Sequence, residues 1–134
     1  MVAYNFQAQF ADAVANGQKR QTIRAPRKDN RHAKPGDKLQ LFTGMRAKSC
    51  RKLRDAVCHD SCVIRLEHDK AWTFGPQELF IGDNLERLAR SDGFTCWADM
   101  RDWFDKAHGL PFTGQMIRWL VPRNPDGTPK EAVA

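Results

Sequence analysis

Apolar positions along the chain recur in two periods, and these predict a mixture of helices and strands. Helical spacing in the first segment stops at Asn16-Gly17, so we predict a first helix that ends near Asn16. A second helix is predicted over residues 83–90, and a third begins after Thr95, a residue type favoured at N-caps. The third helix should bury one stripe, formed by Trp97, Met100, Phe104 and Ala107.

Alternating apolar and polar residues predict the strands. The segment from Cys50 to Glu67 is expected to form two strands, and the final strand, 114–121, has apolar residues on both faces, which favours a central position in a sheet. Gln21-Thr22-Ile23-Arg24 is consistent with a short strand or a turn. The remaining strands are predicted at 4–6, 38–41 and 71–74.

Length and composition predict one folded α+β domain. The chain has 134 residues, of which 41% are hydrophobic and 28% charged, values typical of globular proteins. We predict a domain over residues 1–121 and a flexible C-terminal tail over 122–134, because this last segment is rich in proline and polar residues and cannot bury a face. No internal repeat is visible.

Two protein classes are disfavoured by the sequence. No apolar run reaches the roughly 18 residues that span a bilayer, and the first residues do not resemble a signal peptide, so we expect a cytoplasmic protein without a membrane partner. The four cysteines are then expected as reduced thiols. Cys58-x3-Cys62 is not a standard zinc spacing, so we expect neither a metal nor another cofactor.

Positive charge is concentrated in one part of the chain. The net charge is +6, yet residues 19–54 hold 13 Lys and Arg against only Asp29 and Asp37. A local basic block of this kind predicts an anionic partner such as RNA, and it leaves DNA open as an alternative. The other interpretation is a solvated loop that serves solubility alone.

Several motifs occur in an order that resembles the ASCH domain family. They are Gly17-Gln-Lys19-Arg-Gln-Thr22-Ile-Arg24, Pro35-Gly36-Asp37, Asp92-Gly93-Phe94 before a helix, and Phe112-Thr-Gly114 before a strand. The resemblance covers about residues 4–121, and its most specific part is Gly-x-Lys-x-x-Thr-x-Arg. It implies a small PUA-like mixed β-barrel flanked by about three helices, with a cationic cleft that binds RNA or a modified nucleoside.

The resemblance also implies a chemistry. Some small bacterial members of the family are amidohydrolases that deacylate N4-acetylcytidine with a Lys, a Thr and an acid, which correspond here to Lys19, Thr22 and Asp92. Lys19 would be the base or electrostatic activator, Thr22 the nucleophile and Asp92 the proton donor. The chain departs from the family pattern at Asp92, where Glu is typical, and the missing methylene shortens the reach by about 1.5 Å.

Each of these residues also has a purely structural interpretation. Lys19 could complement the carboxyl end of the first helix, Thr22 could be a β-branched strand residue, and Asp92 could be a turn residue before glycine. Arg24 shares a strand face with Thr22, where it could orient the substrate, or it could form a surface salt bridge with an acid such as Asp37. As a base, Lys19 requires burial or nearby cations to lower its pKa.

A non-enzymatic RNA-binding module is the alternative function, and ribonuclease activity is a third. Trp72, Trp103 and Phe42 could stack on a base, although core packing is the simpler role for each. The chain is expected to act as a monomer or a homodimer. The residues predicted to contact substrate or RNA are basic, and they are Arg20, Arg24, Arg27, Lys28, Arg31 and Lys34.

Overall fold

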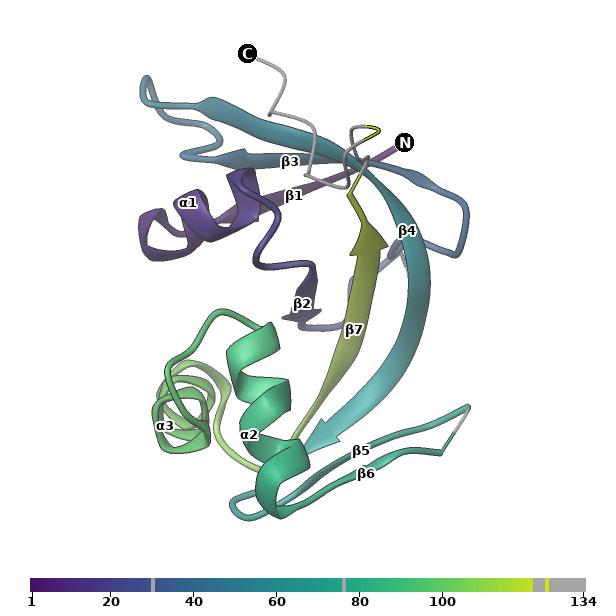
Figure 1. Cartoon of the computed structure of the whole chain (residues 1–134), viewed down its shortest axis with the longest axis vertical. Coiled ribbons are helices and arrows are strands. Elements are labelled where there is room, and N and C mark those ends of the chain that lie inside the picture. Colours follow the sequence, from purple (N-terminus) through teal and green to yellow (C-terminus); the bar gives the residue numbers. More distant parts are fainter. Residues whose placement is uncertain (30, 76, 122–124, 126–134) are drawn as a thin grey trace. The chain divides into compact units, whose positions relative to one another are not determined.

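The computed structural model describes residues 1–29, 31–75, 77–121 and 125, and within these ranges the fold is α+β with three helices and seven strands (Figure 1). The α+β prediction is confirmed; apart from Pro125, the predicted tail over 122–134 lies outside the described residues. The elements are β1 (Val2–Phe6), α1 (Ala8–Ala15), β2 (Gln21–Arg24), β3 (Lys38–Thr43), β4 (Arg51–Leu66), β5 (Ala71–Thr73), β6 (Leu79–Phe80), α2 (Gly82–Ser91), α3 (Trp97–His108) and β7 (Phe112–Leu120).

All seven strands belong to one mixed sheet. The strand order is β1-β3-β4-β5-β6, and β7 pairs with both β4 and β2, so the central position predicted for the last strand is confirmed. β1 runs parallel to β3 with Val2 opposite Leu39, whereas β3–β4, β4–β5 and β5–β6 are antiparallel. Within the described ranges, β1 and β6 are the two ends of this path and do not pair with each other.

The chain divides into two compact units. The first contains Met1–Arg20, Ala33–Asp60 and the described residues from Arg118 onward. In it, α1 packs on β1 and β3. Arg54 is 2% exposed, and its Nη1 donates to the carbonyl of Ala15 at 2.9 Å. This guanidinium satisfies a carbonyl at the negative end of α1, where a cation is favoured.

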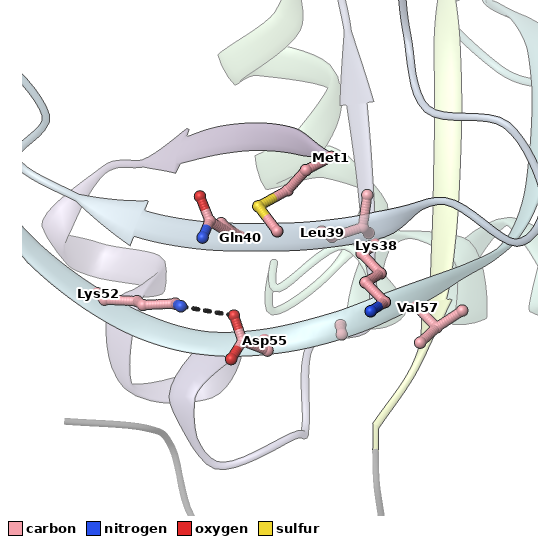
Figure 2. Close-up of a pocket in the computed structure, with 8 residues that line it drawn as sticks. Met1, Lys38, Leu39, Gln40, Lys52, Asp55 and Val57 are labelled. Carbon is pink, nitrogen blue, oxygen red and sulfur yellow. Dashed lines mark ion pairs between the residues drawn. The ribbon is translucent and has the colours of Figure 1, made fainter.

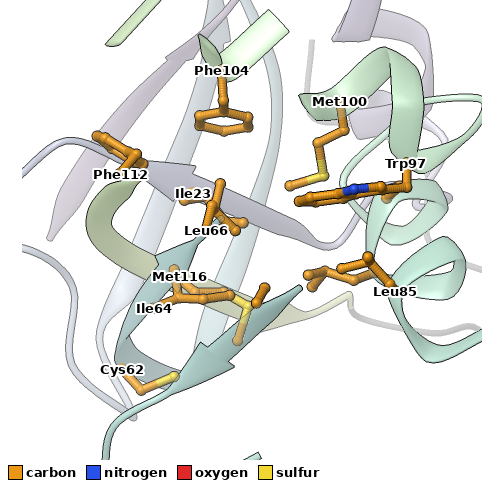
Figure 3. Close-up of a cluster of buried hydrophobic side chains, with 13 residues drawn as sticks. Ile23, Cys62, Ile64, Leu66, Leu85, Trp97, Met100, Phe104, Phe112 and Met116 are labelled. Carbon is orange, nitrogen blue, oxygen red and sulfur yellow. The ribbon is translucent and has the colours of Figure 1, made fainter. Parts of the chain in front are cut away.

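The second unit contains Gln21–His32 and Ser61–Ile117. Its core lies where one face of β4 and β5 meets α2 and α3, and Ile23 of β2 belongs to the same cluster (Figure 3). α2 and α3 also pack on each other. Burial of Ile23 therefore anchors β2, the strand that carries the Thr22-x-Arg24 end of the motif. The buried helical residues are Leu85, Leu88, Ala89, Trp97, Met100 and Phe104.

The two strands predicted between Cys50 and Glu67 are wrong, because β4 is one strand of 16 residues. Its polar middle suggested a turn, yet Asp60 and Ser61 in this stretch have partners on β7. The Asp60 carboxylate accepts hydrogen bonds from Nε and Nη2 of Arg118, and Ser61 Oγ accepts one from Gln115 Nε2 at 2.9 Å. Cross-strand hydrogen bonds of this kind stabilise polar residues within a strand, so β4 runs through this stretch without a turn.

Two details of the predicted third helix also differ. Its N-cap is Cys96 rather than Thr95, and the first backbone N–H is satisfied from another helix, since Trp97 N donates to Glu86 Oε2 at 3.0 Å. Ala107 is exposed in the last turn, so the buried stripe ends at Phe104. No helix in the part of the chain that the structure describes is long and apolar enough to cross a membrane.

Candidate functional site: the motif strand and its surroundings

Strand β2 buries most of the motif that it carries. Gln21 and Thr22 are each 5% exposed, and Arg24 is half-buried. Because side chains alternate along a strand, Gln21 and Ile23 lie on one face, and Thr22 and Arg24 lie on the other. The apolar anchor Ile23 thus fixes the direction in which the Thr22 hydroxyl and the Arg24 guanidinium point.

Thr22 and Arg24 are joined by a hydrogen bond. Arg24 Nε donates to Thr22 Oγ1 at 2.8 Å. A guanidinium that donates to a hydroxyl oxygen favours negative charge on that oxygen, and it leaves the hydroxyl hydrogen free to be given to another acceptor. The pair therefore has the polarity that an activated threonine nucleophile requires.

Asp92 contacts Gln21, the residue that precedes Thr22 in β2. It is the C-cap residue of α2 and precedes Gly93, which has φ of 95°, so it does lie in the turn that ends this helix. Its side chain, however, is 3% exposed, and Asp92 Oδ1 accepts a hydrogen bond from Gln21 Nε2 at 3.2 Å. A buried carboxylate is uncommon without such partners.

Gln21 is a residue that the sequence interpretation missed. It lies inside the motif, and strand alternation puts it on the face of Ile23 that turns toward the core. A buried amide needs partners for its hydrogen-bonding groups, and it finds one in Asp92. The signal that could have revealed it is a polar residue at an inward-facing position of a strand.

Lys19 belongs to the first unit and is buried there, so it is not a surface lysine. It is 3% exposed, and its Nζ lies 5.0 Å from the ring centroid of Phe10 and 5.7 Å from that of Phe6. Its backbone N–H donates to the Ala13 carbonyl in the last turns of α1. Aromatic faces attract an ammonium group, so α1 and β1 supply a specific environment for this amine.

Trp119 adds a second polar group to this part of the first unit. Its ring packs edge-on against Phe6 with centroids 5.9 Å apart, and its Nε1 is buried without a hydrogen-bond partner among the described residues. A buried indole N–H normally finds an acceptor. The position is therefore one where a ligand oxygen could be bound.

A close backbone approach explains the glycine in Phe112-Thr-Gly114. An added Cβ at Gly114 would lie 2.5 Å from the carbonyl oxygen of Arg24 and 2.7 Å from the Phe112 ring. Glycine in a strand often marks such an approach. The absence of a side chain at Gly114 therefore lets β7 approach β2 closely at Arg24. This contact joins the Phe112-Thr-Gly114 motif to the motif that ends at Arg24.

The basic segment after β2 is folded on itself. Arg27 Nη1 donates to the Arg31 carbonyl at 3.4 Å, and the Arg31 N–H donates to Asp29 Oδ1 at 3.1 Å. His32 Nε2 lies 2.9 Å from the Ala25 carbonyl. These bonds keep the guanidinium groups of Arg27 and Arg31 at the surface, where both side chains are exposed.

His32 responds electrostatically to this basic environment. Burial of the ring lowers its pKa below the ordinary value, and the nearby guanidinium groups of Arg27 and Arg24 lower it further. The hydrogen bond to Ala25 and the charge of Asp29 act in the opposite direction. The net effect favours a neutral imidazole within a cationic loop.

The other predicted contact residues are distributed over both units. Lys28, in the second unit, is exposed; Arg20 and Lys34, in the first, are exposed too. The Lys34 backbone N–H donates to Asp37 Oδ2 at 2.8 Å, so Asp37 shapes the turn before β3. The Arg20 carbonyl accepts from the N–H of Trp119 at 3.0 Å. Their side chains are accessible to an anionic partner.

The aromatic residues considered for base stacking have different surroundings. Trp103 packs against Phe94 and Phe104, with the Phe104 centroid 4.9 Å away, which is a packing role. Trp72 is half-buried beside Phe74 on β5, and Phe42 is half-buried on β3. All four cysteines are free, and the described residues contain no group of three or more His, Cys, Asp or Glu that could hold a metal ion.

A pocket of about 410 Å³ lies in the first unit, on the surface formed by β3 and β4 (Figure 2). Lys52 Nζ forms an ion pair with Asp55 Oδ1 at 2.7 Å at its edge. None of the predicted site residues lines it. Its lining residues are Met1, Lys38, Leu39, Gln40, Lys52, Asp55, Ala56 and Val57.

Comparison with known proteins adds no relative: no protein-family model matches the chain, and no curated protein or solved structure matches it.

Proposed function

We propose that this chain is an ASCH-type protein that binds a modified nucleoside or RNA and hydrolyses the amide of N4-acylated cytidine. The observation that carries the proposal is the burial of the motif's polar residues. Six polar or charged side chains are buried in the described part of the chain, and four of them are Lys19, Gln21, Thr22 and Asp92. Burying such groups costs free energy, so their concentration in two of the matched motifs, Gly17–Arg24 and Asp92–Phe94, favours a functional role.

The proposed reaction begins with Thr22. Its Oγ1 attacks the acyl carbon while its proton passes to Lys19 Nζ, and an acyl-threonine ester forms as the C–N bond breaks. Asp92, protonated before the reaction, donates its proton to the departing exocyclic amine, which gives cytidine. Water then hydrolyses the ester to the carboxylic acid and the free Thr22 hydroxyl, and the proton held by Lys19 returns through water to Asp92.

Arg24 and Gln21 act on the two reacting groups in this scheme. Arg24 donates to Thr22 Oγ1 and so stabilises charge that develops on the attacking oxygen. Gln21 donates to Asp92 Oδ1 and fixes the orientation of a carboxylate that is one methylene shorter than the Glu typical of the family. The buried N–H of Trp119 is available to an oxygen of the ligand.

The test is conversion of N4-acetylcytidine to cytidine by the purified protein, followed by chromatography. We expect turnover in the wild type and a loss of at least about 100-fold in Lys19→Ala and Thr22→Ala, the range typical for removing a base or nucleophile. Thr22→Ser keeps the hydroxyl and should retain measurable activity. Absence of turnover in the folded wild type would overturn the hydrolase assignment.

Matched controls separate chemistry from folding. Thr113→Ala removes an exposed threonine of β7, and Lys106→Ala removes an exposed lysine of α3. Both should turn over N4-acetylcytidine at the wild-type rate. If Thr113→Ala lowered turnover as much as Thr22→Ala, the loss at Thr22 could not be assigned to its hydroxyl.

The second candidate is an RNA-binding module without catalysis, and the folded basic loop favours it. Exposed cations held by internal hydrogen bonds can contact phosphates without first ordering the chain. In this case affinity for an RNA oligonucleotide should fall by orders of magnitude from low to moderate salt. Replacing Lys28, Arg31 and Lys34 by alanine should weaken binding and reduce the salt dependence, while a salt-independent affinity would contradict this candidate.

We also propose a fold family and a cellular location for this chain. We assign the mixed sheet to a PUA-like barrel, supported by the order of elements and by the motif positions. The cytoplasm is the proposed location, supported by four free cysteines and by a substrate class that derives from RNA.

A further inference from the structure

The second unit exposes an apolar surface on the sheet formed by β4, β5 and β6. Eight large apolar side chains are exposed in the described part of the chain, and four of them lie between residues 63 and 81. Monomeric proteins rarely gather such residues in one place unless a partner covers them. These four are Val63 (38% exposed), Phe74 (44%), Leu79 (54%) and Ile81 (53%).

Strand register and one further backbone hydrogen bond place Val63, Phe74 and Leu79 on one face. Arg65 lies opposite Trp72, and Trp72 lies opposite Leu79, so the three form a row across β4, β5 and β6. The next row is Val63 with Phe74, whose N–H donates to the Val63 carbonyl. The opposite face of these strands holds Ile64, Leu66 and Ala71, which are buried in the core. We call the exposed side the outer face; it comprises Val63, Arg65, Trp72, Phe74 and Leu79. Ile81, the N-cap of α2, directly follows β6 in the chain.

Aromatic anchors lie at the centre of the outer face. Trp72 and Phe74 are in edge-to-face contact with centroids 6.3 Å apart, and the cations of Arg65 and Lys70 each lie 5.7 Å from the Trp72 ring. Trp, Phe and Arg are enriched in the cores of protein–protein interfaces. The cation–π contacts hold Trp72 in a fixed position, which reduces the entropy lost on association.

Local charge discriminates between a protein and a nucleic acid as the partner. Residues 61–81 carry Arg65 and Lys70 against Glu67, Asp69 and Glu78, a balance of −1, although the whole chain is +6. Nucleic-acid interfaces are strongly positive, so this face is unsuited to RNA.

We propose that the outer face is a homodimer interface, with a second copy of this chain as the occupant. Two copies with a charge of +6 repel each other, and this nearly neutral face lets them approach at the lowest electrostatic cost. A two-fold axis presents the same patch on both subunits, so Trp72, Phe74 and Leu79 of one copy would pack against the same residues of the other. β6 is the end of the strand path, and its edge lies beside Leu79.

The experiment is sedimentation equilibrium of the whole chain over a range of concentrations, at low and at moderate salt. We expect a wild-type species of twice 15.3 kDa, a dissociation constant raised roughly tenfold or more by Leu79→Glu, and the same result for Ile81→Glu. Leu120→Glu is the matched control, because Leu120 is an equally exposed leucine (56%) in the first unit. It should leave the dimer unchanged.

Three results would overturn the proposal. They are a wild type that stays at 15.3 kDa at all concentrations, a dimer that persists in folded Leu79→Glu and Ile81→Glu proteins, and a dimer that Leu120→Glu disrupts equally. Circular dichroism establishes that each variant is folded. Loss of RNA-oligonucleotide binding in Leu79→Glu without a change in mass would identify the face as a nucleic-acid surface instead.

Discussion

Replacement of Gly114 by alanine should destabilise the protein through one defined contact. The added Cβ would lie 2.5 Å from the Arg24 carbonyl oxygen, about 0.5 Å inside the 3.0 Å that real Cβ atoms respect. That neighbour is backbone and cannot rotate away, and the Phe112 ring closes the other side at 2.7 Å. Overpacking of this kind costs about 1–3 kcal/mol, while removing a glycine from a strand returns about 0.5–1 kcal/mol.

The net expectation is a loss of about 1–2 kcal/mol in the free energy of unfolding, or roughly 3–8 °C in melting temperature for a chain of this size. Urea and thermal unfolding of Gly114→Ala measure it, with the exposed neighbour Thr113→Ala as the control, which should stay within about 0.5 kcal/mol of the wild type. The shifted Arg24 backbone should also reduce N4-acetylcytidine turnover. A Gly114→Ala protein as stable as the wild type would refute the close approach.

Three further predictions concern polar groups that are buried or half-buried. Gln21→Leu should lower the free energy of unfolding by about 1.5–3 kcal/mol, because it removes a donor from the buried Asp92 carboxylate; a double-mutant cycle with Asp92→Ala that gives no coupling would contradict this. Burial raises the pKa of the Cys58 thiol from 9.0 to about 11. The free energy of unfolding should therefore be unaffected by this thiol below pH 9 and fall by up to about 3 kcal/mol as the pH approaches 11. In urea titrations at alkaline pH, Cys58→Ala should remove this fall, and Cys50→Ala should not. The pKa of His32 is lowered from 6.5, so its contribution to stability should be present above pH 6.5 and fade below it, and an unchanged acid profile in His32→Gln would contradict that assignment.

Local patterns predicted the elements well where one face of a segment is apolar. The end of α1 at Asn16, the extent of α2 and the final strand all follow from periodicity and from stop residues. β4 was split wrongly because its polar middle is satisfied by Arg118 and Gln115, which are more than 50 residues away in the sequence. Cross-strand partners at that distance leave no local signal.

The candidate site was predictable in its residues and not in its contacts. The motif identified Lys19, Thr22 and Asp92, but not that all three are buried, since Lys and Asp are usually exposed. Gln21 went unrecognised because a glutamine in a short strand has no distinctive pattern until its partner is known. Strand alternation predicted that Arg24 and Thr22 share a face, and the structure adds the hydrogen bond that joins them.

The residues that the two proposed functions use differ in their exposure to solvent, and this difference can be measured. Thr22 and Asp92 are 3–5% exposed, so a substrate whose carbonyl must reach Thr22 Oγ1 requires local opening around β2. The basic loop at Arg27 and Arg31 is exposed and can contact phosphates without any such change. Hydrogen exchange should therefore respond in β2 when N4-acetylcytidine binds, and only in residues 25–34 when an RNA oligonucleotide binds. If RNA also protected β2 from exchange, RNA and the nucleoside would bind at the same site. If the nucleoside changed exchange only in residues 25–34, Thr22 would not be the nucleophile.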